Sequence, residues 1–334
     1  MARGLCRSFA RLILLAAGCG FALPLAAQSF VAAQPTSAVA PAEGRRSEFA
    51  PGVLTVIPPD VDRADAIQLH DVVEIRADKK LQWEPYSTTV SRTLYEMAKD
   101  APFVQNAWCL ELTMKPLRMI EVEVPQADGQ IRKRLIWYLV YRVRNTGVGL
   151  AGKVSDNGEY VTVEQGTEPI RFLPEFVLVS QDRDAAGNRV HKAYLDRVVP
   201  AAIPEIARRE LRGGQLLSSV EVAQQELAIE TGRTQQGVWG VATWVDVDPE
   251  IDFFSVYVAG LSNGYRWEDP AGAYKPGDPP GKGRQFTHKT LQLNFWRPGD
   301  EYQENEREIR LGVPAGKANL YDVGEGVAYR WLYR

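Results

Sequence analysis

The chain has 334 residues and a formal net charge of −3, and 45% of its residues are hydrophobic. This length supports one large hydrophobic core or two ordinary ones. Its lysines and arginines do not form a clustered basic stripe, so the composition argues against a nucleic-acid partner.

The first 27 residues have the pattern of a signal peptide. Three arginines precede an uncharged apolar run over residues 12–25, and this run is shorter than the about 20 residues that a bilayer span needs. Small residues follow, so we expect cleavage after Ala27 or Ala33. Without the three leader arginines the formal net charge becomes −6. We therefore predict an exported protein, periplasmic or extracellular, with no transmembrane helix in the mature chain.

The cysteines leave a second form of export open. Cys19 ends the run 15–19, which is similar to a lipoprotein cleavage box, so a lipid tether at Cys19 is the alternative to free export. Cys6 and Cys19 both belong to the leader, and only Cys109 then remains in the mature chain. An intrachain disulfide is therefore excluded. Cys109 lies in an apolar, strand-like run, which predicts a buried and inert thiol.

Residues 28–52 are rich in Ala, Pro, Ser and Gln, a composition typical of a flexible linker. Residues 53–213 are expected to form a β-rich domain, with the clearest strand at Leu135–Arg144, where apolar residues alternate. Turn residues at Asp128–Gly129 and Gly187–Asn188 predict hairpins. Further strand-like runs in this region cover residues 67–75, 108–114, 119–124, 160–163, 172–179 and 190–199.

Two segments of this region have helical spacing instead. Between Ser87 and Pro102, apolar residues recur on one helical face. A second helix is expected to begin near Pro204 and to end before Gly213, because acidic residues favour its first turn and arginines its last turn.

Residues 214–334 predict a second β-rich domain that is also rich in aromatic residues. Regularly spaced short strands with turn residues between them favour a sandwich or a barrel. We therefore predict a mainly β chain of two antiparallel β-sandwich domains with immunoglobulin-like character, one or two short helices and a domain boundary near Gly213. The strand-like runs of the second domain are 219–227, 238–247, 253–261, 290–296, 309–313 and 328–333.

Four sequence segments are similar to those of a known group of proteins. They cover residues 240–244, 252–258, 265–269 and 291–300. In these segments the chain resembles an uncharacterised family of exported proteins of planctomycete-type bacteria. The resemblance extends from about Leu54 to the C-terminus. It implies an envelope or periplasmic setting, and it transfers no catalytic residue because no activity is known for that family.

Acidic residues alternate at Asp246, Asp248, Glu250 and Asp252, as oxygen ligands of calcium sometimes do. The segment lacks the glycine and the bidentate glutamate that a helix-loop-helix calcium site requires at its sixth and twelfth positions. We predict a solvated turn between two strands, with a calcium site as the alternative, because Pro249 presets a turn.

Catalytic motifs are weak throughout the chain. Paired carboxylates for glycoside hydrolysis could come from the acidic turn or from Glu268 and Asp269, but the sequence does not supply the distance between them. His70, His191 and His288 are far apart in the sequence and form no ligand pair. We therefore assign no catalytic residue.

Large aromatic residues are the candidates for ligand binding, since they could stack on sugar rings as well as fill a core. The chosen candidates are Trp244, Tyr257, Tyr265, Trp267 and Trp296.

These observations predict a non-catalytic envelope or periplasmic module that binds a protein or a polysaccharide and needs no cofactor. The alternative is a carboxylate-dependent secreted hydrolase, or a calcium-dependent binding protein, that uses residues 246–252. A cleft with two convergent carboxylates of raised pKa would favour this alternative.

Overall fold

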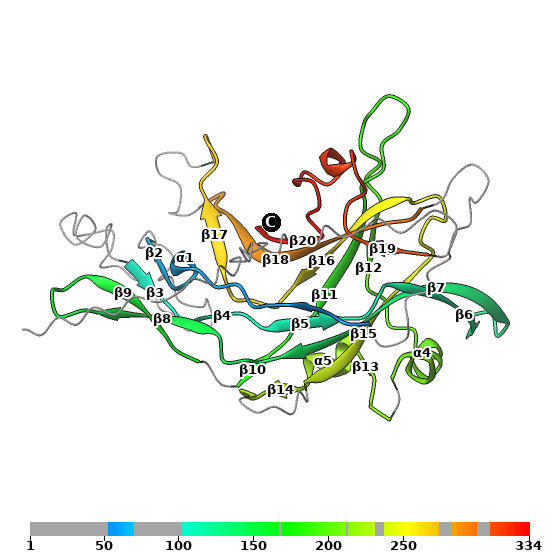
Figure 1. Ribbon diagram of the computed structural model, residues 1–334, viewed down its shortest axis with the longest axis horizontal. Coiled ribbons are helices and arrows are strands. Elements are labelled where there is room, and N and C mark those ends of the chain that lie inside the picture. The colour runs from blue at the N-terminus through cyan, green and yellow to red at the C-terminus, as the bar shows by residue number, and fades with distance from the viewer. Residues whose placement is uncertain are drawn as a thin grey trace, which may run out of the picture. The chain divides into compact units, whose positions relative to one another are not determined.

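Two long strands organise the computed structural model: β7 (Ile131–Arg144) and β18 (Gln285–Trp296). Around them lie two main sheets, and the fold is mainly β (Figure 1). The structure describes residues 53–69, 102–166, 169–211, 213–230, 237–273, 282–298 and 308–334.

The first sheet is built on β7, which pairs along one side with β15 and along the other with β5 and then β6. The β6–β7 hairpin turns at Gly129, whose positive φ of 78° suits the predicted Asp-Gly turn. The other strands of this sheet are β1 (Thr55–Ile57), β5 (Glu111–Met114), β6 (Arg118–Pro125), β13 (Leu217–Ser218) and β15 (Val238–Val245).

The second sheet is built on β18, which pairs with β16 and β17 along one side and with β19 and β20 along the other. β11 and β12 extend the sheet beyond β16. The bounds of these strands are β11 (Glu175–Ser180), β12 (Ala193–Leu195), β16 (Phe253–Ala259), β17 (Tyr265–Glu268), β19 (Arg310–Leu311) and β20 (Tyr329–Tyr333).

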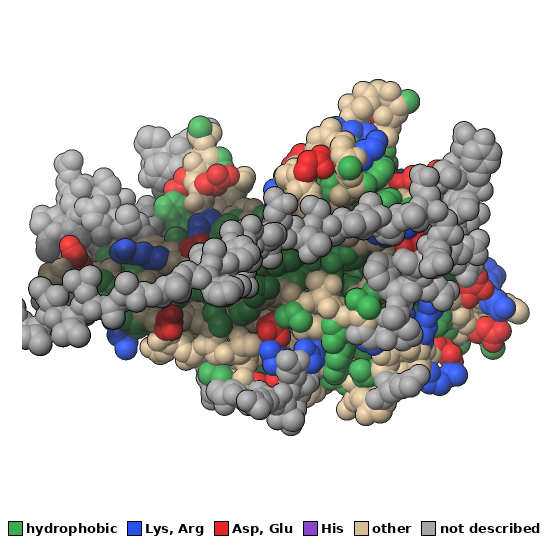
Figure 2. Space-filling model, in the orientation of Figure 1, with side chains coloured by type: hydrophobic (Ala, Val, Ile, Leu, Met, Phe, Trp, Pro, Cys, Tyr) green, Lys and Arg blue, Asp and Glu red, His purple; other side chains and the backbone are tan. Residues whose placement is uncertain are grey.

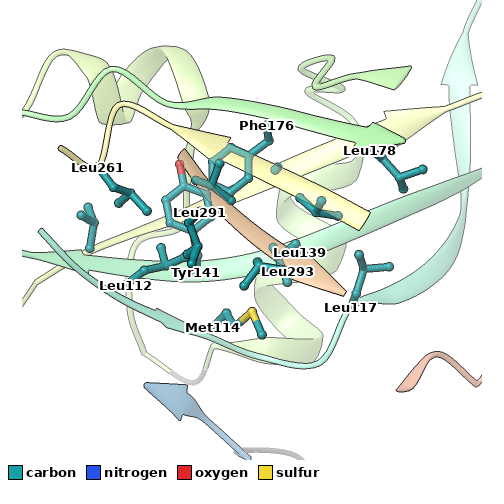
Figure 3. Close-up of a cluster of buried hydrophobic side chains, with 14 of the residues drawn as sticks. Leu112, Met114, Leu117, Leu139, Tyr141, Phe176, Leu178, Leu261, Leu291 and Leu293 are labelled. Atoms are coloured by element: carbon teal, nitrogen blue, oxygen red, sulfur yellow. The ribbon is translucent and has the colours of Figure 1, made fainter. Parts of the chain in front are cut away.

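One hydrophobic core joins the inner faces of the two sheets. Trp137 of β7 packs edge-on against Phe254 of β16, with ring centroids 5.4 Å apart, and Phe254 stacks on Phe295 of β18 at 5.6 Å. Figure 3 shows leucine, tyrosine and phenylalanine side chains from both sheets pointing toward one another. Because alternate residues of each strand enter this core, the residues between them lie on the opposite faces.

Helix α4 (Ala202–Glu210) covers the other face of the first sheet. Ala202 and Ile206 pack there against Ile136, Tyr138 and Val140 of β7. β7 is thus buried on both faces, which explains its nearly continuous apolar run.

The remaining elements are short. A three-stranded sheet and two two-stranded sheets contain β4 (Ala107–Trp108), β8 (Gly149–Val154), β9 (Tyr160–Glu164), β2 (Ile67–Leu69), β3 (Pro102–Val104), β10 (Ile170–Arg171) and β14 (Glu226–Leu227). The short helices are α1 (Arg63–Ala66), α5 (Ser219–Ala223) and the 3₁₀ helix η3 (Ala318–Leu320).

The predicted boundary near Gly213 does not separate two sandwiches. β7 precedes it and β15 follows it, yet they pair over eight residues from Ile136 to Val143. In the second sheet, β11 likewise pairs with β16. Residues 48–334 form one compact unit, so the two-domain prediction is corrected: two sheets share a core to which both halves contribute.

Several local predictions can be compared with the structure. The helix after Pro204 is confirmed as α4, and the strand at residues 135–144 is confirmed as part of β7. The strand predicted over residues 219–227 is wrong at Ser219–Ala223, because Ser218 and Glu221 form a reciprocal capping box that starts α5, and only Glu226–Leu227 is a strand. The helix predicted between Ser87 and Pro102, the signal peptide and the linker lie outside the described residues.

The strand predicted over residues 108–114 is interrupted. Cys109 forms an isolated bridge with Ser262, and the Leu110 amide donates to the Leu261 carbonyl at 2.8 Å, so β4 and β5 are separate strands. Among the described residues, no helix is both long enough and apolar enough to cross a membrane.

The shared core generates a first prediction. We expect Phe254→Ala to lower the free energy of unfolding by about 3–5 kcal/mol, because it removes a fully buried ring that contacts both sheets. Phe103→Ala is the matched control: its side chain is 42% exposed, so its effect should be well below that range. Urea denaturation of the three proteins measures the difference, and equal effects would contradict the shared core.

Candidate functional site

The outer face of the second sheet carries several aromatic residues that lie outside the core. Val256 and Val258 of β16 enter the core, so Tyr257 between them points to the opposite face. On β18, Leu291 and Leu293 enter the core, which places the even-numbered residues, including Phe286, on the outer face.

Strand β17 adds two aromatic residues to this face. Tyr265 pairs with His288, and Trp267 pairs with Phe286. The rings of Tyr265 and Phe286 are 6.1 Å apart between centroids, and Phe286 is 48% exposed. We call Tyr257, Tyr265, Trp267 and Phe286 the outer aromatic face.

Guanidinium groups accompany two of these rings. The Arg284 guanidinium carbon lies 3.8 Å from the centroid of the Trp267 ring, and that of Arg334 lies 4.0 Å from the centroid of the Tyr257 ring. Arg284 also forms two hydrogen bonds with the carboxylate of Asp269, at 2.8 and 2.9 Å. A stacked cation holds each ring in place. The charge of Arg284 is balanced by Asp269, whereas Arg334 is exposed beside Tyr257.

β17 and the beginning of β18 project from the second sheet, and the end of the chain lies beside them (Figure 1). In the space-filling view, a depression separates this projection from a second projection on the same edge of the molecule (Figure 2).

Two predicted aromatic candidates lie apart from these four residues. Trp244 has no exposed surface and lies in the shared core, so its prediction as a ligand-binding residue is corrected. Trp296 lies at the far end of β18, where the Arg310 guanidinium carbon is 5.1 Å from its ring centroid. The sequence did not single out Phe286, although its place opposite Trp267 follows from the hairpin register.

The acidic turn does connect two strands, β15 and β16, as predicted. Its carboxylates are bound by separate basic residues. Asp246 accepts a hydrogen bond from Arg134 at 2.6 Å, and Asp248 is paired with Lys192. The hydrogen bond from Lys192 lowers the pKa of Asp248.

The described residues contain no group of three or more His, Cys, Asp and Glu side chains that could hold a metal ion. Of the remaining turn residues, Glu250 donates its amide to Asp248 at 3.0 Å, and Asp252 is partly buried.

Asp252 interacts electrostatically with a second carboxylate, Asp182, which the sequence analysis did not select. Burial raises the pKa of Asp182, and the negative charge of Asp252 raises it further. Burial also raises the pKa of Asp252, against the opposing effect of Arg297. Asp182 accepts hydrogen bonds from the Phe253 amide at 2.9 Å and the Ser180 hydroxyl at 3.0 Å.

Cys109 is poorly suited to act as a nucleophile, and the described histidines are poorly placed to bind a metal ion together. Cys109 is buried, and this burial raises its pKa to about 12, so the thiol stays protonated at neutral pH. His191 and His288 lie on separate segments, and His70 lies outside the described residues.

A buried cluster of charged side chains lies on the inner side of β17, β18 and β20. The Lys289 ammonium donates to Oδ2 of Asp65 at 2.9 Å. Oδ1 of Asp65 accepts from the Tyr333 hydroxyl at 2.5 Å and from Arg266 at 3.0 Å. These contacts join the segment after β1 to the last strands of the second sheet.

Hydrogen bonds and neighbouring charges together outweigh the effect of burial on the pKa values of this cluster. Burial alone would raise the pKa of Asp65, but hydrogen bonds from Tyr333 and Lys289 outweigh it and lower that pKa. For Lys289, burial would lower the pKa, but the hydrogen bond to Asp65 raises it. The ion pair is therefore the stable protonation state.

The local sequence explains how Asp62 and Asp65 interact, but it does not explain which distant residues contact Asp65. Asp62 and Asp65 form a reciprocal capping box at α1, and this Asp-x-x-Asp spacing is visible in the sequence. The partners Arg266, Lys289 and Tyr333 are about two hundred positions or more away along the chain.

Comparison with known proteins gives no relative: no family model, no curated protein and no solved structure matches the chain. The geometry of the described residues is therefore the basis for the functional proposals.

The Asp182–Asp252 pair generates a second prediction. Asp252→Asn should lower the pKa of Asp182, because it removes a neighbouring negative charge. Acids with raised folded-state pKa values stabilise the fold at low pH and lose this contribution as pH rises through those values. The substitution should therefore increase stability more at pH 7 than at pH 3.

Carbon-detected NMR titration of Asp182 and urea denaturation at both pH values test this expectation. Asp156→Asn, on the turn between β8 and β9, is the control that should leave the pKa of Asp182 unchanged. An unaltered Asp182 titration in Asp252→Asn would show that the two carboxylates do not interact.

The acidic turn generates a third prediction. We expect wild type and Asp248→Ala to show the same small response of melting temperature to millimolar calcium, with chelator as reference, since Lys192 and Arg134 engage Asp248 and Asp246. Calcium at 100 times its dissociation constant would stabilise a binding protein by about 2.7 kcal/mol. A calcium-dependent rise of several degrees that Asp248→Ala abolishes would establish a metal site.

Proposed function

We propose that this protein is a non-catalytic exported module that binds an envelope polysaccharide or protein through the outer aromatic face. The observation that carries the proposal is the grouping of Tyr265, Trp267 and Phe286 on one face of the β17–β18 hairpin. Polysaccharide is the favoured ligand, because flat aromatic rings offer stacking surfaces for the apolar faces of sugar rings.

Positive charge supports recognition by the same face. The exposed Arg334 lies over Tyr257, so donors of hydrogen bonds stand beside one stacking surface, while Arg284 holds Trp267 and is itself paired with Asp269. This combination is suited to a sugar, which presents hydroxyl or carboxylate groups at the edges of its rings. A protein segment could use the same rings and cations, and binding of a protein is the other outcome that the experiment below can separate.

The proposed setting is the periplasm or the extracellular space, with lipid tethering at Cys19 as the alternative. The charged and then apolar leader supports export, and the resemblance to exported planctomycete-type proteins agrees with it. We also propose an immunoglobulin-like arrangement of the two sheets, supported by their mostly antiparallel strands and shared core.

A carboxylate-dependent hydrolase is the second candidate. One observation favours it: Asp182 and Asp252 interact, and both have raised pKa values. A carboxyl group that stays protonated to higher pH can serve as a general acid. Loss of hydrolytic activity toward polysaccharides in both Asp182→Asn and Asp252→Asn would support this function over a purely binding role.

The fourth prediction tests the favoured function. Trp267→Ala should weaken retention on insoluble polysaccharide by roughly tenfold or more, since truncation of a central aromatic anchor commonly costs about 2 kcal/mol. The probes are cellulose, chitin and purified peptidoglycan in sedimentation assays. Phe103→Ala, which alters an exposed ring on β3, is the control and should bind like wild type.

The outcomes separate the two ligand classes. Retention on one polysaccharide that Trp267→Ala reduces and Phe103→Ala preserves supports the proposal. Binding of a purified envelope protein with the same dependence on Trp267, and no retention on the three polysaccharides, would assign the face to a protein partner. Equal retention of both variants on a polysaccharide would place its binding site elsewhere.

A further inference from the structure

The buried cluster holds an amine and a carboxyl group in a geometry suited to reaction with each other. Nζ of Lys289 lies 2.9 Å from Oδ2 of Asp65, and the two side chains are 2% and 0% exposed. Lys289 belongs to β18, whereas Asp65 belongs to α1, so a bond between them would join distant parts of the chain.

A second carboxylate is placed to move protons. Oδ2 of Asp60 lies 3.2 Å from the same Nζ atom, and the Asp60 side chain is 51% exposed. Asp60 thus contacts both the buried amine and solvent, which is the position that a general base needs.

Two donors point at the oxygen where negative charge would develop. Tyr333 donates its hydroxyl to Oδ1 of Asp65 at 2.5 Å, and the Arg266 guanidinium donates to the same atom at 3.0 Å. The other oxygen, Oδ2, accepts from the Asp62 amide at 3.1 Å and faces Lys289. The two oxygens therefore have different surroundings, with Oδ1 in a site that resembles an oxyanion hole.

We propose that Lys289 and Asp65 form an intramolecular amide bond in the folded protein. The proton of the ion pair moves from Nζ to Oδ2, and the neutral amine attacks Cγ of Asp65. Negative charge develops on Oδ1, beside Tyr333 and Arg266. Asp60 takes a proton from the nitrogen and returns it to Oδ2, which leaves as water. Ammonium and carboxylate thus become an amide and one water molecule, and no other reactant is needed.

The fold lowers the barrier to this condensation. Reacting groups that are held in contact have effective molarities of about 10⁵–10⁸ M, so the amine and the carboxyl group react far faster than they would in free solution. Burial limits the access of water to the product. Since the proton transfer starts from a stable ion pair, formation of the bond should be slow relative to folding.

The bond would fasten the segment after β1 to the second sheet. It would connect residues 224 positions apart in the sequence, and closing such a long loop restricts the unfolded chain. The described residues contain a single free cysteine, Cys109, and therefore form no disulfide among themselves. The amide bond would give them a covalent cross-link of another kind.

Mass spectrometry of the purified full chain tests the proposal. After trypsin digestion, residues 64–76 should be recovered joined to residues 285–307, with no cleavage after Lys289 and with the mass of one water missing. Lys289→Arg keeps the positive charge but removes the nucleophilic amine, and its two peptides should be separate. Asp60→Asn should keep the fold and leave most of the chain without the bond.

The outcomes are distinct from those of the binding experiments. Separate peptides with cleavage after Lys289 in wild-type protein, incubated after folding, would overturn the proposal. A linked peptide in Asp60→Asn at the wild-type rate would overturn the role of Asp60. Circular dichroism of each variant verifies that loss of the linkage does not reflect loss of the fold.

Discussion

The contact between the two sheets at Trp137, Phe254 and Phe295 is the constraint on which the rest of the structure depends. These rings come from β7, β16 and β18, which are the central strands of their sheets. Once alternate residues of β16 and β18 enter the core, the intervening residues must occupy the outer face. The core thereby places Tyr257 and Phe286 outside, and the candidate binding face is a geometric consequence of the packing.

The same packing explains why the chain does not divide into two domains. Strand β15 completes a sheet begun by β7, and β16 pairs with β11, although residues on opposite sides of Gly213 form each pair. A sandwich made from either half alone would lack a central strand in one sheet. Folding must therefore bring together distant segments, which is slower than forming local contacts.

Charged residues complete the junction at the edge of this core. Asp65 is enclosed by Lys289, Arg266 and Tyr333, which satisfy both of its oxygens despite complete burial. An unpaired carboxylate in that position would be strongly destabilising. Arg266 lies between Tyr265 and Trp267 in sequence, so β17 directs its cation toward the cluster and its aromatic rings toward the outer face. Strand β17 thus contributes residues to both the buried charged cluster and the outer aromatic face.

The sequence by itself determined the local features of this protein. Alternation at residues 135–144, the Asp128–Gly129 turn and the charge asymmetry of α4 depend on neighbouring residues, and each appears in the structure. The tertiary structure alone decided which strands share a sheet, that Trp244 is buried while Trp267 lies on the outer face, and that Asp65 meets Lys289. These outcomes depend on contacts between residues far apart in the chain, and periodicity carries no information about the partner of a strand.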